Sequence, residues 1–342
     1  MSVKIAVIGC GTWGKNLVRN FYNLGSLYTC CDIDSELLGS TASEYPDINC
    51  ICNIDEVLNS PDIDGVAIAT PSHTHYSLVK KALNAGKHVY VEKPIATTSE
   101  EAKELNELSD EKGLVLMVGH LLLYHPAVNR LKAMVQEGAL GEIRYVQSDR
   151  LNINFYRNDR SVMWDLAPHD VSMTSYVLGS IPISVRSAIG TSMNNDGIMD
   201  ITHLDIEFPN NIHAHISNSW IHPIKRVIFL VRGTKATAVL DDAEFSNKLH
   251  IYDNFSADKR IVEYPEYVEI EPLKLECQHF ISSITNKMKP RSDGDNGYEV
   301  VRILEEAERI MLGTQYNKIH SLQLASSRKK ADRIGFVNES LT

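Results

Sequence analysis

The chain has 342 residues, of which 43% are apolar and 23% are charged, and its formal net charge is -10. This composition is typical of a soluble globular protein. At roughly 150 residues per domain, the length predicts two domains. A net acidic chain is unfavourable for nucleic-acid binding. The longest apolar run, residues 114–124, is too short to span a bilayer, and no secretory signal precedes the first apolar run. We therefore expect a cytoplasmic protein whose partners include neither nucleic acid nor membrane.

The first part of the chain alternates strand-like and helix-like segments. Strands are predicted at 3–8, 26–32, 48–52, 65–70, 88–92 and 114–119, and helices at 12–24, 35–44, 72–86 and 98–112. Alternation of this kind predicts a doubly wound parallel α/β sheet. We assign residues 1–122 to such a Rossmann domain.

The remainder follows another pattern. Helices are predicted at 126–136, 166–178, 273–284 and 298–312, and alternating strands at 142–150, 183–192, 200–208, 212–220 and 226–234. These predict an α+β domain, residues 123–320, with a large open, mostly antiparallel sheet that has one wet face. Residues 321–342 are expected to form a flexible tail.

Cysteine and histidine spacing does not predict a metal site. The cysteines form no C-x-x-C pair and lie mostly in or beside apolar runs, so buried free thiols are expected at residues 10, 30, 31, 50, 52 and 277. His213 and His215 share one strand face and could bind a metal. The preferred interpretation is that they belong to the polar side of an alternating strand.

A glycine-rich turn follows the first predicted strand. In "GCGTWG", Gly9, Gly11 and Gly14 flank Cys10, Thr12 and Trp13 and open a helix. Glycines here permit a tight turn and close approach of the backbone to a pyrophosphate, which the helix N-terminus attracts. The alternative is an ordinary turn.

Asp32 ends the second predicted strand, where a carboxylate can bind the adenine ribose. It would repel a 2′-phosphate, and no Lys or Arg lies between Asp32 and Ser43 to offset it. The sequence therefore favours NAD over NADP.

Two further strand ends reach the expected site. Ligands of open parallel sheets bind beyond the carboxyl ends of the strands, which places Thr70, Pro71 and His73 near the cofactor. The alternative is that Ser72 caps a helix whose first turn exposes His73 and His75.

Glu92, Lys93 and Pro94 follow the fifth strand. Adjacent residues on a strand point to opposite faces, so an ion pair between Glu92 and Lys93 is not favoured. Pro94 holds the preceding residue extended. The segment would thus present a rigidly held ammonium beside the nicotinamide.

These segments, with "WDLAPHD" at 164–170, resemble the Gfo/Idh/MocA oxidoreductase family to about Leu312. The resemblance implies a Rossmann domain followed by a domain whose open sheet often forms the oligomer interface, so a homodimer or homotetramer is expected. It also implies that Lys93 is the active-site lysine and that Glu92 lies close to the nicotinamide.

"WDLAPHD" supplies a second set of candidates. We expect Asp165 to cap the helix and Pro168 to lie in its first turn. Asp165 and His169 are four residues apart on one helical face, where the carboxylate could orient the imidazole as a proton acceptor. The alternative is a helix cap beside an exposed histidine.

Substrate candidates flank this helix. Arg157 and Arg160 precede it and suit a phosphorylated or carboxylated substrate, and Trp164 lies beside them. A solvated basic loop is the alternative. His120 and His125 lie at the domain junction, and their spacing demands no role.

The sequence thus predicts an NAD-dependent dehydrogenase acting on a secondary hydroxyl of a sugar. His169 would accept the proton and Lys93 would stabilise the oxygen, although these roles could be exchanged. "WDLAPHD" most resembles the branch that acts on nucleotide-linked sugars of surface polysaccharides. The alternatives are an inositol or free polyol dehydrogenase and a sugar sensor that binds NAD without turnover.

Overall fold

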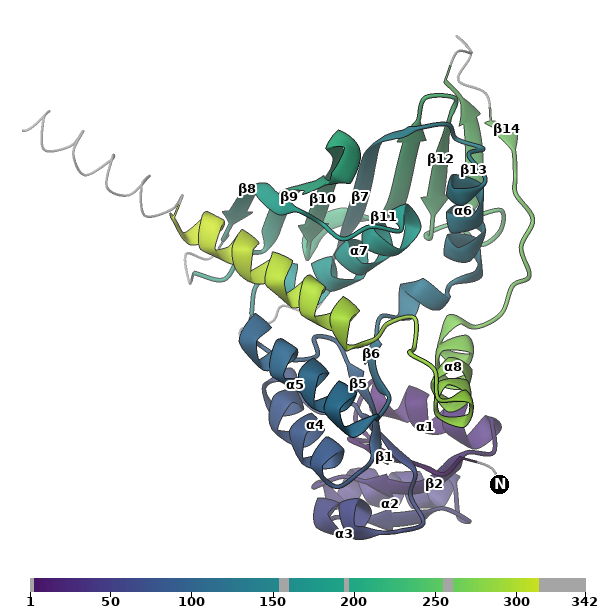
Figure 1. Ribbon diagram of the computed structural model, residues 1–342, viewed down its shortest axis with the longest axis vertical. Helices are drawn as coiled ribbons and strands as arrows, with labels where there is room; N and C mark the ends of the chain where they lie inside the picture. Colours follow the sequence, from purple (N-terminus) through teal and green to yellow (C-terminus); the bar gives the residue numbers. More distant parts are fainter. Residues whose placement is uncertain (1–2, 154–159, 194–196, 255–260, 314–342) are drawn as a thin grey trace, which may run out of the picture.

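The computed structural model describes residues 3–153, 160–193, 197–254 and 261–313, which form two sheets connected by helices (Figure 1). Within these ranges no helix is both long enough and apolar enough to cross a membrane. The six cysteines are free; Cys50 is half-buried and Cys52 exposed, so the prediction of buried thiols is wrong for these two.

The first sheet has six strands in the order β3-β2-β1-β4-β5-β6, and its pairings are parallel. The strands are β1 (Ile5–Ile8), β2 (Leu27–Cys31), β3 (Asn49–Ile51), β4 (Gly65–Ile68), β5 (His88–Glu92) and β6 (Leu116–Gly119). The helices are α1 (Gly14–Asn23), α2 (Ser35–Glu44), α3 (Ile54–Asn59), α4 (His75–Asn84) and α5 (Ser99–Lys112). The predicted doubly wound α/β architecture is confirmed, and the unpredicted α3 is only one and a half turns long, too short to show a period.

The second sheet has eight described strands in the order β14-β13-β12-β11-β7-β10-β9-β8. It is antiparallel except where β10 pairs with β7. Its strands are β7 (Ile143–Ile153), β8 (Ser184–Thr191), β9 (Ile201–Phe208), β10 (Ile212–Ser219), β11 (Ile221–Gly233), β12 (Ala236–Asp241), β13 (Leu249–Asp253) and β14 (Ile261–Glu263). The mostly antiparallel open sheet is confirmed. Figure 1 shows α6 (Pro126–Gln136) and α7 (Val162–Leu178) on one of its faces.

The alternation along the strands separates a core face from a polar face. Ala214 and Ile216 of β10 are buried, whereas His215 is exposed and His213 lies 3.3 Å from Asp205. This agrees with the polar-side interpretation of the two histidines. Within the described ranges no three His, Cys, Asp or Glu side chains gather to hold a metal ion.

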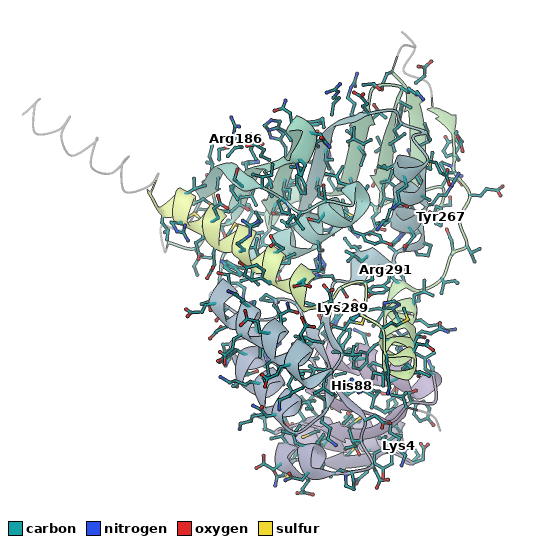
Figure 2. The ribbon with its side chains drawn as sticks, viewed as in Figure 1. Lys4, His88, Arg186, Tyr267, Lys289 and Arg291 are labelled. Carbon is teal, nitrogen blue, oxygen red and sulfur yellow. The ribbon has the colours of Figure 1, made fainter. Side chains whose placement is uncertain are left out.

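The C-terminal helices do not follow the predicted division at residue 122. Helix α8 (Pro272–Asn286) returns to the first domain, where Phe280 packs edge-on against Phe21 and Tyr90. After α8, Arg291 Nη1 donates to Leu123 O at 2.6 Å, at the junction between the two sheets (Figure 2). The sequence predicted a helix at 273–284 but could not indicate which core it enters.

The last helix, residues 294–313, contributes to both domains. Val301 belongs to the core of the first sheet, whereas Ile303, Leu304 and Ala307 belong to that of the second. In Figure 1 it is the long yellow-green helix between the sheets. Its packing therefore fixes one domain against the other.

A buried ion pair holds α7 on the second sheet. Asp170, which is fully buried, accepts hydrogen bonds from Arg150 Nη2 at 3.0 Å, Ser148 Oγ at 2.8 Å and Asn218 Nδ2 at 2.9 Å. A buried carboxylate is tolerated when it is paired and hydrogen-bonded in this way. The arrangement sets the position of α7, and hence of the residues on its first two turns.

Replacing Asp170 with alanine should lower the free energy of unfolding by about 3–5 kcal/mol, because it leaves Arg150 buried without its partner. Urea denaturation measures the change. The matched control is Glu142→Ala, which breaks the exposed Arg144–Glu142 pair and should cost at most about 1 kcal/mol. Equal losses in the two variants would contradict a structural role for the buried pair.

Candidate active site

The glycine-rich loop lies at the carboxyl end of β1 and has the shape expected for a dinucleotide. Gly9 has φ +92°, and a Cβ on Gly14 would lie 1.8 Å from Gly9 O, so neither position admits a side chain without rearrangement. Around Gly11, in contrast, no atom of the described residues lies within 4 Å of where a Cβ would be. The loop is closed on its inner side and open on the side where a pyrophosphate would lie.

The start of α1 is suited to an anion. Trp13 at its N-cap makes no side-chain capping bond within the described structure, and the first turn carries no acidic residue. The N–H groups and positive dipole end are thus available to phosphates. Thr12 and Trp13 are both exposed on this loop. The residues present fit a dinucleotide.

Asp32 connects the loop to β2. Its Oδ2 accepts from Cys10 N at 2.6 Å and its Oδ1 accepts from Asp34 N at 2.9 Å. Each carboxylate oxygen has a second lone pair, so these bonds leave capacity for ribose hydroxyls. The backbone contacts fix the carboxylate at the edge of the loop, in the position predicted for it.

At the end of β5, Glu92 turns toward the glycine-rich loop. Its Oε1 accepts from Trp13 Nε1 and from Tyr90 Oη. Burial raises the pKa of Glu92 to about 6, and the hydrogen bonds from Trp13 and Tyr90 oppose that rise. Lys93, the next residue, has different partners.

The Lys93 ammonium reaches across to α7, where it donates to Asp165 O at 2.7 Å and lies 3.4 Å from Asp165 Oδ1. Both side chains are mostly buried, with 18% and 12% exposed. Asp165 is therefore engaged by Lys93. The contact joins the strand end of the first domain to the first turn of α7 in the second.

His169 lies one turn further along α7. Its Nδ1 is buried and has no hydrogen-bond partner in the part of the chain that the structure describes, so Asp165 does not orient the ring through that atom as predicted. Burial lowers the pKa of His169 well below its ordinary value, and the nearby charges of Lys93 and Arg150 lower it further. The imidazole is thus neutral at pH 7, with one ring nitrogen unprotonated.

His120 is a third polar group at this place. It follows β6, is 1% exposed, and its Nδ1 donates to Asn296 Oδ1 at 2.6 Å. Because an amide oxygen can only accept, this bond places the proton on Nδ1 and leaves the lone pair on Nε2. Burial lowers the pKa of His120 to about 4, and Lys93 contributes to the decrease.

At the end of β4, the structure excludes the alternative in which Ser72 caps a helix. Residues 72–74 form a short 3-10 helix in which Ser72 makes no capping bond, and its Oγ instead accepts from Arg160 Nη2 at 2.5 Å. Thr70 Oγ1 lies 2.7 Å from Thr74 Oγ1, and Pro71 and His73 are exposed.

The alternative that exposes His75 in the first turn of a helix is also wrong, because His75 is 1% exposed. Its Nδ1 lies 2.7 Å from Pro94 O and its Nε2 lies 2.8 Å from Thr70 O. The ring therefore bridges the segments that follow β4 and β5. Sequence reasoning missed this because the intervening 3-10 turn rotates the residue inward.

Several predicted details of α7 are wrong. The helix begins at Val162 with Ser161 at its N-cap, so Asp165 lies in the first turn rather than at the cap. Pro168 consequently lies inside the helix rather than in its first turn. Ser161 followed by the apolar residues Val162, Met163 and Trp164 was a signal for this earlier start, which the assignment of the cap to Asp165 overlooked.

The substrate candidates have separate outcomes. Arg157 lies outside the described residues. Arg160 lies against Ser72, beside the segment that follows β4. Trp164 donates its indole N–H to Glu308 Oε1 at 3.0 Å and packs against the cores of both domains. Interdomain packing therefore accounts for Trp164 without a substrate.

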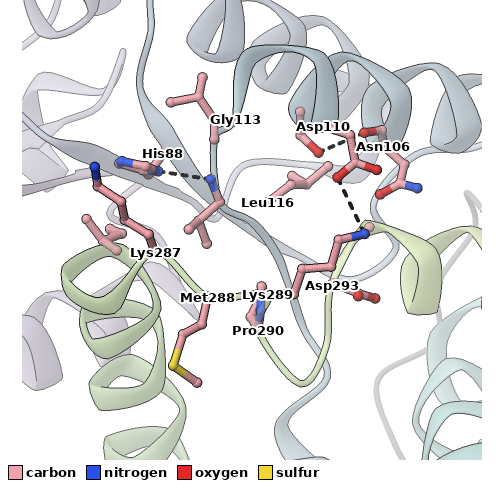
Figure 3. Close-up of a pocket in the computed structure, with 15 residues that line it drawn as sticks. His88, Asn106, Asp110, Gly113, Leu116, Lys287, Met288, Lys289, Pro290 and Asp293 are labelled. Carbon is pink, nitrogen blue, oxygen red and sulfur yellow. Dashed lines mark hydrogen bonds and ion pairs between the residues drawn. The ribbon is translucent and has the colours of Figure 1, made fainter.

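A pocket elsewhere in the first domain is not part of this site. It lies between the C-terminal end of α5 and the segment after α8 and includes His88, Asp110, Lys287 and Lys289 (Figure 3). His88 begins β5, whereas Lys93 follows its last residue. The pocket is thus at the opposite end of the strand from the Lys93 cluster, away from where parallel sheets bind nucleotides.

Comparison with known families agrees with the fold and with the loop geometry. Residues 3–120 match the model described as the oxidoreductase family with an NAD-binding Rossmann fold. Residues 128–239 match the model of the GFO/IDH/MocA C-terminal domain. The two matches together cover most of the described chain.

Similar proteins include sugar and polyol dehydrogenases. UDP-N-acetylglucosamine 3-dehydrogenase of Acidithiobacillus ferrooxidans is 26% identical over 307 residues, which is 87% of this chain and 94% of that protein. Its solved structure has a TM-score of 0.79 and covers 91% of this chain and 97% of its own. The scyllo-inositol 2-dehydrogenase (NADP(+)) of Bacillus subtilis is 26% identical over 60% of each chain. A levoglucosan dehydrogenase complexed with NADH and levoglucosan shares the fold, with a TM-score of 0.80, 22% identity, and coverage of 91% of this chain and 98% of its own.

His169 should stay neutral throughout the range from pH 8 to pH 6, because its pKa is lowered below 6.5 and the ring is neutral above its pKa. Histidine side-chain NMR measures the titration. Lys93→Met should move the midpoint upward by removing a neighbouring positive charge, whereas Lys81→Met, an exposed change in the last turn of α4, should leave it unchanged. A midpoint near 6.5 in the unmodified protein would refute this environment for His169.

Proposed function

Because the chain belongs to the Gfo/Idh/MocA oxidoreductase family, we propose that it is an NAD-dependent dehydrogenase that acts on a secondary hydroxyl of a nucleotide-linked sugar. The observation that carries the proposal is the cluster of Lys93, His169 and His120 beside the glycine-rich loop. An ammonium and a neutral imidazole at the carboxyl ends of the parallel strands supply the groups that alcohol oxidation requires.

In this proposal, the bound nicotinamide supplies the hydride acceptor. The substrate oxygen lies between Lys93 and His169. As the carbinol C–H bond breaks, the hydroxyl proton passes to the unprotonated nitrogen of His169, and the C–O bond becomes a carbonyl. Lys93 donates a hydrogen bond to the same oxygen and stabilises its developing negative charge.

His169 and Lys93 are not equally suited to act as the general base. His169 is held neutral by burial and by positive neighbours, so it is able to accept a proton at pH 7. Lys93 contacts Asp165, a partner that favours the charged ammonium. We therefore assign the base to His169 and the oxygen contact to Lys93. Asp165 positions Lys93, a role different from the orientation of His169 expected from sequence.

Alanine at either Lys93 or His169 should lower kcat by on the order of 10²-fold or more, the usual scale for loss of a general acid or base. The double variant should be little worse than the worse single variant, since groups that act on one oxygen behave as a unit. Steady-state kinetics measures both effects, with NADH binding as the control for an intact cofactor site. Near-normal turnover in both single variants would exclude the assignment.

The preference for NAD rests on Asp32. Its carboxylate is fixed by Cys10 N and Asp34 N and would repel a 2′-phosphate. Asp32→Ala should therefore narrow the difference between the Kd values for NADH and NADPH, measured by fluorescence titration. Asp62→Ala, a change of an acid paired with Lys4 at the surface of the same domain, is the matched control. NADPH binding as tight as NADH binding in the unmodified protein would rule out the preference.

The choice of a nucleotide-linked sugar is supported by the relative of Acidithiobacillus ferrooxidans, which matches nearly the full length of both chains. The inositol-type relative matches over a smaller share and supports a free polyol as the second candidate. A nucleotide would supply binding energy remote from the reacting carbon, so its removal should lower kcat as well as raise KM.

The decisive experiment compares UDP-sugars, dTDP-sugars, free hexoses and myo-inositol as reductants of NAD at matched concentrations. We expect the highest kcat/KM with a nucleotide-linked sugar. Faster turnover of a free polyol would favour the second candidate. Tight NAD binding with no turnover of any sugar would favour the non-catalytic sensor. Mass spectrometry of ligands retained through purification provides an independent identification.

A further inference from the structure

A buried tyrosine hydroxyl lies between two carboxyl groups behind the cofactor loop. Tyr90 Oη is 3.0 Å from Glu92 Oε1 and 3.1 Å from Glu276 Oε2. Tyr90 and Glu276 are fully buried, and Glu92 is 9% exposed. A phenol has one proton, so it can donate to only one of the two carboxyl groups. The other contact is a hydrogen bond only if that carboxyl group itself carries a proton.

The two carboxyl groups have unequal surroundings. Glu92 accepts from Trp13 Nε1 and precedes Lys93, whose charge favours the ionised form. Glu276 on α8 has an Oε1 atom with no hydrogen-bond partner among the residues that the structure describes. An isolated buried carboxylate is far more costly than a buried carboxylic acid. The proton therefore belongs on Glu276.

The other titratable groups near Tyr90, Glu92 and Glu276 do not change the conclusion that the proton is on Glu276. Burial raises the pKa of Tyr90, Tyr124 and Cys277, and the charge of Glu92 raises the pKa of Tyr90 and Cys277 further, so these three stay neutral at pH 7. Burial also raises the pKa of Glu276 well above its ordinary value, and the charge of Glu92 adds to the rise. The positive charge of Lys93 beside Glu92 opposes the rise in the pKa of Glu92.

Strand β6 lies against one side of the cluster formed by Tyr90 and Glu92. A Cβ on Gly119 would lie 2.7 Å from Tyr90 Oη and 3.0 Å from both carboxylate oxygens of Glu92. The Cα of Gly119 therefore lies against the cluster and leaves no room for a water molecule on this side. Tyr90 and Glu92 must satisfy each other there, whereas Glu276 Oε1 has no partner among the described residues.

We propose that Glu276 is a positioning residue of the cofactor site: it donates a proton to Tyr90, Tyr90 donates to Glu92, and Glu92 is thereby held as an anion that favours NAD⁺ over NADH. The oxidised nicotinamide carries a positive charge that the reduced ring lacks, so a fixed anion beside it discriminates between them. This inference rests on the proposed function, because it requires a nicotinamide at the end of β5.

The proposal predicts how the two cofactor forms bind as the pH changes. Glu92 has a pKa of about 6, so it is anionic above that pH and becomes neutral below it. Between pH 7.5 and pH 5, the Kd for NAD⁺ should rise relative to the Kd for NADH by about tenfold, the effect of one pKa unit of interaction. Isothermal titration calorimetry with each form over this range measures the ratio without turnover.

Two variants test the direction of the hydrogen bonds. Tyr90→Phe removes the donor to Glu92. The midpoint, the pH at which the ratio of the Kd values for NAD⁺ and NADH is half changed, should therefore move upward by about one unit. Glu276→Gln keeps a neutral donor of the same shape and should leave the midpoint unchanged. A downward shift in Glu276→Gln would mean that Glu276 is ionised and would overturn the proposal, as would an unchanged midpoint in Tyr90→Phe. A purely structural role would alter affinity for both forms equally.

Infrared spectroscopy of the cofactor-free protein tests directly whether Glu276 carries a proton. The difference spectrum between the unmodified protein and Glu276→Gln at pH 7 should contain the carbonyl band of a protonated carboxylic acid. Absence of the band would overturn the proposal whether or not NAD binds. If the band is present but neither cofactor form binds, the proposed function fails and, with it, the claim on NAD⁺. Binding of both forms with a pH-independent ratio would also overturn the claim.

Discussion

The contact between the Lys93 ammonium and Asp165 joins the two domains at the candidate site. Both side chains are largely removed from water, so each depends on the other for its charge to be tolerated. Lys93 is fixed by the end of β5, and Asp165 by the first turn of α7. His169 then lies one helical turn away on the same side of α7. A single interdomain contact thus brings an ammonium and an imidazole from separate parts of the chain to one place.

Other polar contacts across the same junction involve the last helix. His120 bonds Asn296, Trp164 bonds Glu308, and Ser99 bonds Glu305. Each of these groups would otherwise be buried or half-buried without a partner, which is unfavourable. The orientation of α7 relative to the first sheet is therefore determined by hydrogen bonds as well as by apolar packing. The cluster joins residues directly after the ends of β5 and β6, Lys93 and His120, to His169 of α7.

The local features of the site could be predicted from sequence. The turn at Gly9, Gly11 and Gly14, the carboxylate of Asp32 and the strand end at Lys93 are specified by neighbouring residues and by the rule that parallel strands bind ligands at their carboxyl ends. The alternation of strands and helices likewise predicted the fold, since it reflects burial on two faces of the first sheet and one face of the second.

The sequence could not predict which side chains of the site contact one another. The spacing of Asp165 and His169 correctly placed them on one side of α7 but could not reveal that Lys93 approaches the carboxylate first. The alternative that placed His75 at the surface failed because the 3-10 turn before this residue cannot be predicted from residue types. Glu276 lies on an amphipathic helix that the pattern identified, yet its contact with Tyr90 joins residues 186 positions apart. Pairings over such separations depend on tertiary packing, which local patterns do not encode.

The last helix has a consequence for how the chain folds during synthesis. The core of the first domain includes Phe280 of α8 and Val301 of the last helix, although its sheet is complete at residue 119. A ribosome that has released only the first 122 residues has therefore exposed a sheet whose core lacks these side chains. Its apolar surface stays accessible until nearly all of the second domain has been translated. The two domains are separate in architecture but must be completed together, so the nascent first domain exposes apolar surface that favours aggregation until the second is made.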